Sequence, residues 1–423
     1  MAQLPKNFRP EPYDYHQELT LKIDNLSGHG AGVARDNGWV VFVPHALPGE
    51  TVRARIFRNH KNHSEADCME VIAPAADRVE PECRLFGKCG GCQYQHLDYD
   101  SQLEWKRRHV ADCLSRIAGL DTAVETVVPS PRRYAYRSKL TPHFDRPRDG
   151  VIGPIGFLKR GSSRHIIDVE QCPIATDAVN AELKTIRDYI RSSWGKRQGG
   201  TLLLRDTDEG VTTNPNATVM EQVGEARFRF KAGDFFQNNS FLLPEMVAHV
   251  TAQATAEGQR FLVDAYCGGG LFCISAARHF EQCVGIEISA DAVKLAQGNA
   301  EFNEAKNCTF VLGTAAEIFG RVDYSGAETA MIVDPPRKGC DDEFLKQAFA
   351  FGAQTIVYVS CDPATLARDL KAFAENGYEL AHVKPFDMFP QTRHIECIAT
   401  LTRNVSSRHV SETTNNTNDA NGD

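Results

Sequence analysis

A short run of β-branched and aromatic residues, Ile356 to Val359, constrains the fold of this chain most strongly. The run stops abruptly at a Ser-Cys-Asp-Pro turn that carries Cys361, and a helical pattern follows. This arrangement predicts a buried parallel strand with one cysteine at its carboxyl end. Ligands bind at the carboxyl ends of strands in open α/β sheets, so Cys361 is a candidate nucleophile as well as a candidate structural cysteine.

The rest of the 423-residue chain is too long for one ordinary core, and its patterning predicts three domains and a tail. Residues 10–75 carry several short alternating strands, which predict a small β-barrel. Residues 76–232 predict a mixed α+β region. Residues 233–405 alternate strands and helices, as an α/β doubly wound sheet does. Residues 406–423 are mostly polar and predict a disordered tail.

Composition narrows the class of protein. A net charge of −8 argues against a general nucleic-acid coat protein but leaves room for a local basic groove. The segment 131–139, which reads PRRYAYRSK, predicts a basic patch with interleaved aromatic rings. A second basic cluster near one turn of the predicted barrel either contacts phosphates or forms a solvated edge. It consists of Arg53, Arg55, Arg58, Lys61 and His63.

The chain has no apolar run long enough to cross a bilayer and no apolar segment at its N-terminus, so we expect a cytoplasmic protein that does not enter a membrane. Thirteen cysteines without a secretory signal indicate reduced thiols, metal ligation or catalysis rather than a disulfide framework.

Three of these cysteines form a glycine-spaced cluster. Cys83, Cys89 and Cys92 have C-x5-C-x2-C spacing, and the glycines let the backbone wrap around a bound centre. Cys172, which follows a predicted strand and precedes a proline, is the best candidate for a fourth ligand. Four cysteines can bind zinc or an iron–sulfur cluster, and spacing alone does not decide between them.

A glycine-rich turn follows the predicted strand Phe261–Ala265 and opens a helix, which is typical of a cofactor pocket. Glu287 ends the next strand about 20 residues on, where an acid can accept hydrogen bonds from ribose hydroxyls. The turn is not the G-x-G-x-x-G of dinucleotide-binding proteins. S-adenosylmethionine therefore fits the pattern better than NAD.

Two further segments can reach the same pocket. Asp334 ends another strand before two prolines, where it can accept a hydrogen bond from a cofactor or a substrate, or cap a helix. Gln237 and Asn239 stand beside two phenylalanines just before the sheet begins, where they form either a lid over the cofactor or a plain loop.

Glu396 lies among apolar neighbours at the start of the last predicted strand. A carboxylate in this position either pairs with a cation such as Arg393 or serves as a general base with a raised pKa. His394 is a rival base, because residues two apart on a strand share a face.

Several motifs together closely resemble the RNA uracil-5-methyltransferase family. They are F236-Q-N-N, D264-A-Y-C-G, D334-P-P-R, S360-C-D-P and F389-P-Q-T-R-H-I-E396. The first domain resembles the TRAM domain of the bacterial 23S ribosomal-RNA branch. Cys83, Cys89, Cys92 and Cys172 match the ligands of the [4Fe-4S] cluster in that branch.

The resemblance implies an S-adenosylmethionine-dependent enzyme that methylates C5 of a uridine in RNA, most directly 23S ribosomal RNA, and acts as a monomer. It implies that Cys361 is the nucleophile and Glu396 the base. It also implies four cofactor contacts, namely Gln237, Tyr266, Glu287 and Asp334. Asp362 departs from the family, which often has asparagine after the cysteine.

Three alternatives stay open. A transfer-RNA uracil-5-methyltransferase shares the whole catalytic pattern, although the bacterial transfer-RNA branch commonly lacks the barrel and the cluster. A cytosine-5-methyltransferase shares the thiolate logic but usually has Pro-Cys at the nucleophile. A non-catalytic iron–sulfur protein that binds RNA would require neither Cys361 nor Glu396.

Overall fold

The computed structural model describes residues 5, 8–192, 198–313 and 319–404. The predicted tail, 406–423, lies outside these residues, and the predicted boundaries near residues 75 and 232 stay predictions. Contacts within the chain divide it into two compact units. The first unit consists of 1–112, 125–246 and 385–396, and the second consists of 113–124, 247–384 and 397–423.

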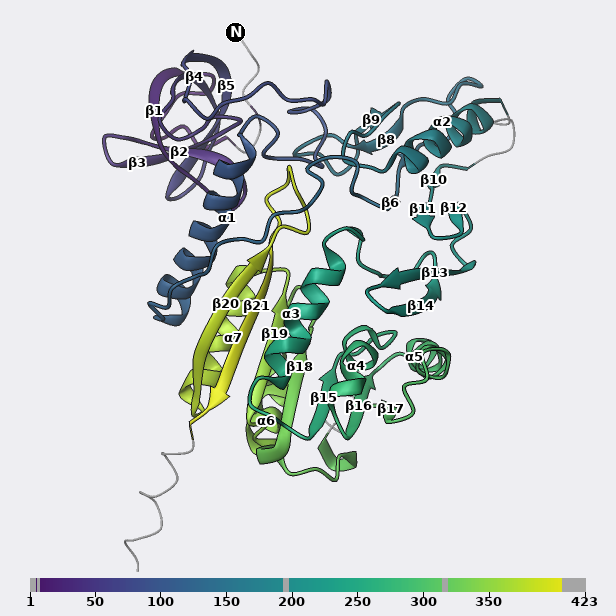
Figure 1. The fold of residues 1–423 in the computed structure, drawn as a ribbon. Coiled ribbons are helices and arrows are strands. Elements are labelled where there is room, and N and C mark those ends of the chain that lie inside the picture. The colour runs from purple at the N-terminus through teal and green to yellow at the C-terminus, as the bar shows by residue number, and fades with distance from the viewer. Residues whose placement is uncertain (1–4, 6–7, 193–197, 314–318, 405–423) are drawn as a thin grey trace, which may run out of the picture. The chain divides into compact units, whose positions relative to one another are not determined.

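The first five strands form a closed barrel in the order β1-β2-β3-β5-β4, which confirms the predicted small β-barrel (Figure 1). Every second residue points inward, so Ile23, Val41, Val52 and Ile56 are fully buried in the barrel core. The strands are β1 (Glu18–Leu26), β2 (Ala31–Asp36), β3 (Trp39–Pro44), β4 (Thr51–Asn59) and β5 (His63–Ala73).

Cross-strand ion pairs engage two of the barrel arginines that the sequence offered as phosphate contacts. The Arg53 guanidinium lies 2.9 Å from the Glu70 carboxylate and 3.3 Å from that of Glu18. Arg55 lies 3.1 Å from Asp67. Both arginines therefore lie in solvent-exposed ion pairs on the barrel surface, where acids balance their charge.

The remainder of the first unit is a mixed α+β region of short sheets around helix α2. Val179 and Leu183 of α2 pack on Leu140 and Leu204. The elements of this region are α1 (Tyr99–Cys113), β6 (Lys139–Leu140), β7 (His143–Phe144), β8 (Ile155–Leu158), β9 (Ile166–Asp168), α2 (Asp177–Ser192), β10 (Gly200–Thr201), β11 (Leu204–Thr207), β12 (Gly210–Thr212), β13 (Thr218–Val223) and β14 (Ala226–Lys231).

A buried ion pair fixes segment 385–396 to helix α1 within the first unit. The Lys106 ammonium lies 2.6 Å from the Asp387 carboxylate, and both side chains are fully buried. Lys106 also donates to the Phe389 carbonyl at 3.1 Å. Gln102 and Gln391 exchange two hydrogen bonds, of 3.0 Å and 3.1 Å. Segment 385–396 is therefore held by charge and by hydrogen bonds that water does not reach.

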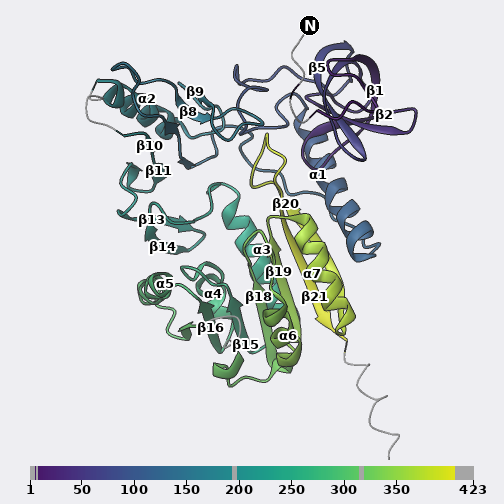
Figure 2. The same cartoon turned by 180° about the vertical axis from the view of Figure 1, so that it is seen from behind.

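The second unit is built on a seven-stranded sheet in the order β17-β16-β15-β18-β19-β21-β20. Helix α3 lies on one face (Figure 1), and α6 and α7 lie on the other (Figure 2). The elements are α3 (Leu243–Thr255), β15 (Phe261–Ala265), α4 (Leu271–Ala276), β16 (Gln282–Glu287), α5 (Ala290–Phe302), β17 (Cys308–Leu312), β18 (Thr329–Val333), α6 (Asp342–Phe351), β19 (Thr355–Ser360), α7 (Pro363–Glu375), β20 (Tyr378–Phe386) and β21 (Glu396–Arg403).

Every residue of β18 and β19 is buried, as expected for central strands covered on both faces. The strand that carries Cys361 toward its end is thus the buried parallel strand that the sequence predicted. The chain runs outward from β15 to β17 on one side and from β18 to β19 on the other. This reversal makes the carboxyl ends of β15 and β18 the topological switch point of the sheet, where ligands of such sheets bind. No helix in the described part of the chain is long and apolar enough to cross a membrane.

We expect Lys106→Met to lower the free energy of unfolding by about 3–5 kcal/mol, because the Asp387 carboxylate would stay buried without its cation. Denaturant unfolding measures this loss. Replacing both partners, as in Lys106→Met with Asp387→Leu, should recover most of it. Lys184→Met is the matched control, because its pair with Asp188 is exposed and contributes about 0–1 kcal/mol. Equal losses for the two lysine variants would contradict the anchoring role.

Candidate active site

The turn after β15 follows a tight left-handed path into helix α4. Tyr266, Gly268 and Gly270 have φ angles of +65°, +53° and +88°. A Cβ atom on Gly270 would lie 2.7 Å from the Ile274 side chain and 3.2 Å from the Phe310 ring. Glycine is thus required at this position both for backbone conformation and for space. The backbone at the turn remains open to close approach by a ligand.

The Glu287 carboxylate at the end of β16 faces this turn. Its Oε2 accepts a hydrogen bond from the Gly268 amide at 3.1 Å, and its Oε1 accepts one from the Ser289 amide at 2.8 Å. The side chain keeps part of its surface exposed. These two bonds fix the orientation of the acid at the sheet edge, where its remaining lone pairs can accept hydroxyl groups of a nucleoside.

Two more acids lie behind this edge. Asp334 follows β18, and desolvation by the surrounding protein raises the pKa of its carboxyl to about 7. Asp264 on β15 is fully buried, and burial raises its pKa well above the usual range, with Asp334 and Glu287 adding to the shift. Asp264 accepts a hydrogen bond from the Cys273 amide at 2.9 Å, which ties helix α4 to β15. An acid within the apolar run FLVDA is the sequence signal for this positioning role.

The loop after β18 is anchored by Asp369 of α7, which sequence reasoning did not identify. The Asp369 carboxylate accepts hydrogen bonds from the Cys340 amide at 2.8 Å and from the Tyr358 hydroxyl at 2.6 Å. A Cβ atom on Gly339 would lie 2.6 Å from the same carboxylate. The only sequence signal for this role is that an acid occupies the buried face of the helix, three residues after Leu366.

Cys361 is the first residue after β19, as the sequence predicted. In the antiparallel ladder between β19 and β21, Ser360 pairs with Cys397. Cys361 directly follows Ser360, and Glu396 directly precedes Cys397. Asp362 begins helix α7 and accepts hydrogen bonds from the next backbone amides at 3.0 Å and 3.1 Å. Aspartate and asparagine cap helices about equally well, so the departure from the family at this position preserves the cap.

Four of the predicted site residues therefore come together at the carboxyl edge of the sheet in the second unit. They are Tyr266, Glu287, Asp334 and Cys361. The other two, Gln237 and Glu396, belong to the first unit, and both are buried, with 5% and 4% of their surface exposed.

Near Gln237, the Asn239 amide donates to the Ser130 hydroxyl at 3.1 Å and to the Met388 carbonyl at 3.2 Å. The loop that the sequence offered as a lid is therefore bonded to segment 385–396. In that segment, the Arg393 guanidinium lies 2.8 Å from the ring of His29 in the barrel. The backbone amide of His394, the rival base, donates to the Thr392 hydroxyl at 3.2 Å.

The structure brings the four candidate metal ligands together in the first unit. The pKa of the Cys92 thiol is raised to about 12, chiefly by burial and in smaller part by the nearby thiols of Cys172, Cys89 and Cys83. The Gly90 amide donates to the Leu158 carbonyl at 3.1 Å. The Cys172 amide donates to the Asn180 side chain at 2.8 Å. Both cysteine segments thus have their backbones fixed before any ligand binds.

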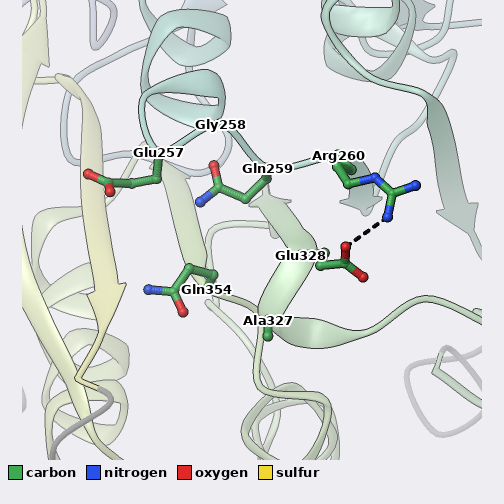
Figure 3. Close-up of a pocket in the computed structure, with 7 residues that line it drawn as sticks. All are labelled: Glu257, Gly258, Gln259, Arg260, Ala327, Glu328 and Gln354. Atoms are coloured by element: carbon green, nitrogen blue, oxygen red, sulfur yellow. Dashed lines mark hydrogen bonds and ion pairs between the residues drawn. The ribbon is translucent and has the colours of Figure 1, made fainter.

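A separate hollow of about 370 Å³ lies at the other edge of the sheet, at the amino ends of β15, β18 and β19 (Figure 3). It is shallow and polar, and Arg260 pairs there with Glu328 at 2.8 Å. We place the site at the carboxyl edge despite this hollow, because the glycine turn, the acids and the cysteine all lie there. The hollow is lined by Glu257, Gly258, Gln259, Arg260, Ala327, Glu328 and Gln354.

Comparison with known proteins identifies the family to which this site belongs. The sequence profile of tRNA (Uracil-5-)-methyltransferase matches residues 216–404, and that of the TRAM domain matches residues 16–68. A tRNA (uracil(54)-C(5))-methyltransferase of Schizosaccharomyces pombe is 41% identical, over 93% of this chain and 80% of the relative. The chain belongs to the RNA uracil-5-methyltransferase family.

Two further relatives agree with this assignment. An uncharacterized RNA methyltransferase of Synechocystis sp. is 32% identical, over 93% of this chain and 98% of its own length. The structure of Pyrococcus abyssi tRNA (uracil-54, C5)-methyltransferase in complex with S-adenosyl-L-homocysteine has a TM-score of 0.72 and 25% identity, and covers 90% of this chain and 99% of its own. The enzyme is thus an S-adenosylmethionine-dependent RNA uracil-5-methyltransferase with a TRAM barrel and a class I methyltransferase sheet.

We expect Glu287→Ala to weaken S-adenosylmethionine binding by about 1–3 kcal/mol, because cofactor hydroxyls would lose a charged acceptor. This corresponds to a rise in Kd of about 5-fold to 150-fold. Titration calorimetry on the folded variant measures it. Glu281→Ala is the matched control, because Glu281 is an exposed acid just before the same strand and pairs with Arg260. Equal Kd values for Glu287→Ala and the native enzyme would remove Glu287 from the site.

Proposed function

We propose that this enzyme methylates C5 of a uridine in transfer RNA, at the position that its relatives' names give as 54. The observation that carries the proposal is the similarity to the Schizosaccharomyces pombe enzyme over most of both chains. A Saccharomyces cerevisiae relative has the same name. These names favour the transfer-RNA alternative over the 23S ribosomal RNA that the TRAM barrel and the cysteines first indicated.

The chemistry begins with Cys361. Uracil C5 is a weak nucleophile, and the ring must be activated before C5 can accept a methyl group. The Cys361 thiolate adds to C6, which forms a carbon–sulfur bond and places the displaced electron pair on the ring as an enolate. The thiol must approach the face of the ring, which base stacking would block. We therefore expect the enzyme to act on a uridine flipped out of its stack.

Methyl transfer and proton removal complete the cycle. S-adenosylmethionine, when bound, supplies the methyl group and leaves as S-adenosylhomocysteine. Gln237, Tyr266, Glu287 and Asp334 are the residues that we assign to holding it. C5 attacks the methyl carbon, so one sulfur–carbon bond breaks as the new carbon–carbon bond forms. Glu396 then accepts the C5 proton, and the electron pair left on C5 expels the Cys361 thiolate and restores the double bond.

Transfer of labelled methyl groups to RNA transcripts tests the substrate. A transfer-RNA transcript should become methylated, and the same transcript with cytidine in place of uridine 54 should not. Nuclease digestion and mass spectrometry should recover 5-methyluridine from the first transcript alone. Methylation of 23S ribosomal RNA in place of transfer RNA would overturn the proposed substrate and restore the first expectation.

A matched pair of variants separates the nucleophile from the base. Glu396→Gln should still permit addition and methyl transfer but stall before elimination, because no group accepts the C5 proton. Methylated RNA bound covalently to this variant should then survive denaturing gel electrophoresis. Cys361→Ala should form no such complex, because no thiolate adds to C6. Normal turnover by Glu396→Gln would mean that the base lies elsewhere, with His394 the next candidate.

We also propose that Cys83, Cys89, Cys92 and Cys172 hold a [4Fe-4S] cluster. Four thiolates form a complete donor set for such a cluster or for zinc. The resemblance of these four cysteines to the cluster ligands of the family's ribosomal-RNA branch supports the cluster over zinc. We assign the cluster a structural role, because methyl transfer moves no net electrons.

We expect protein purified without oxygen to be brown and to contain four iron atoms and four sulfides per chain. Cys92→Ser should lose iron and colour, because it removes one of the four proposed thiolate ligands. Cys113→Ser is the control, because Cys113 lies outside the set. Metal analysis and visible absorption measure both variants. Stoichiometric zinc without iron in the anaerobic protein would contradict the cluster.

A further inference from the structure

The hairpin between β4 and β5 gathers three potential metal ligands on the barrel. His60 lies in the turn, and His63 begins β5. Glu65 stands two residues after His63, so the two side chains share a face of the strand. One ligand atom from each of the three residues lies within 4.8 Å of the other two, and no other group in the described part of the chain meets this criterion.

Buried bonds hold the base of this hairpin in place. The Ser64 hydroxyl donates to the Asn59 side chain at 2.7 Å, and the Trp39 indole donates to the Ser64 hydroxyl at 3.0 Å. Asn59 in turn donates to two backbone carbonyls of the N-terminal segment at 2.8 Å and 2.7 Å. The His60 amide donates to the His63 carbonyl at 2.8 Å. The backbone of the hairpin is thus fixed without help from a ligand, which is typical of a preorganised site.

The separation between His60 and Glu65 suits an ion better than a hydrogen bond. His60 Nε2 lies 3.4 Å from Glu65 Oε1, beyond the range of about 2.7–3.2 Å for a good N–H···O bond. This nitrogen is buried and has no hydrogen-bond partner among the described atoms. Two ligands at about 2.0–2.1 Å from one tetrahedral zinc ion lie about 3.3 Å apart. The observed separation therefore matches one edge of such a tetrahedron.

Neighbouring side chains hold one atom of His63 and one atom of Glu65, which leaves another atom of each residue for a metal ion. His63 Nδ1 lies 2.9 Å from the Asn62 side-chain oxygen, which accepts its hydrogen and leaves Nε2 with a lone pair. Metal-binding histidines are commonly oriented in this way by a partner on the second nitrogen. Arg58 lies 3.9 Å from Glu65 Oε2, so it holds the oxygen that His60 does not face. The centroids of the two imidazole rings lie 4.2 Å apart.

We propose that His60, His63 and Glu65 bind one divalent transition-metal ion of the zinc class. Two imidazole nitrogens and one carboxylate oxygen form a borderline donor set that suits zinc and cobalt, with water in the fourth position. The ion links the turn to β5 across the hairpin. This site shares no residue with the cysteine set.

Titration of the full-length, cluster-loaded enzyme with Co²⁺ tests the proposal. Cobalt bound by nitrogen and oxygen lacks the thiolate charge-transfer absorption of cobalt bound by cysteines, so the spectrum identifies the ligands. The native enzyme should bind one equivalent of Co²⁺ without that absorption. His60→Ala and Glu65→Gln should each weaken binding at least tenfold. His279→Ala, which removes an exposed histidine outside the barrel, should bind as the native enzyme does.

Metal-free thermal unfolding separates loss of a ligand from loss of fold. If His60→Ala unfolds at a lower temperature than the native enzyme, Glu65→Gln decides, because it keeps the size of the side chain. If Glu65→Gln and His60→Ala each bind Co²⁺ with the affinity of the native enzyme, the proposal is overturned. Cobalt spectra with thiolate absorption alone, or no binding at millimolar Co²⁺, would overturn it as well.

Discussion

The ion pair between Lys106 and Asp387 is the interaction on which the arrangement of segment 385–396 depends. Both side chains are fully buried and lie 2.6 Å apart, so each charge is compensated chiefly by the other, with the Phe389 carbonyl beside Lys106 and the Tyr99 hydroxyl beside Asp387. The pair fixes segment 385–396, which leaves the sheet after β20 and returns to it at Glu396, the first residue of β21. A buried pair contributes little net stability against an apolar pair, but it tolerates few other geometries. We interpret it as a device that fixes the path of segment 385–396 along helix α1.

At the sheet edge itself, the order of the strands determines which residues meet. The reversal between β15 and β18 brings the ends of four consecutive parallel strands into one row, and each end carries a candidate residue. Asp264 and Asp369 act behind this row: one holds the start of α4 and the other holds the loop after β18. Their carboxylates satisfy backbone amides that otherwise have no partner at the starts of helices and in loops. The turn after β15 and the loop after β18 are thus held by two buried carboxylates.

Local sequence patterns predicted the elements of the fold well because the signals there are local. The apolar run before Cys361 predicted a central strand, and the glycine turn after Ala265 predicted the start of a helix. The barrel followed from the alternation within residues 18–73. Long-range pairing gave no such signal: Lys106 and Asp387 are 281 residues apart, and nothing near either residue indicates the other. Asp369 was missed for the same reason, since its partners lie on β18's loop and β19. The RNA substrate gave no local signal either, because the catalytic pattern is shared by the ribosomal-RNA and transfer-RNA branches of the family.

The most direct test of the account is the identity of the residue that bonds to the target base. Transfer RNA that contains 5-fluorouridine should trap the native enzyme as a covalent complex with S-adenosylmethionine, because fluorine cannot leave C5 as a proton does. Protease and nuclease digestion followed by mass spectrometry then locates the attached nucleotide on the chain. We predict one modified peptide, with the methylated fluorouridine on Cys361. Attachment to another cysteine, such as Cys267, or a complete absence of adduct under conditions of turnover would contradict the account.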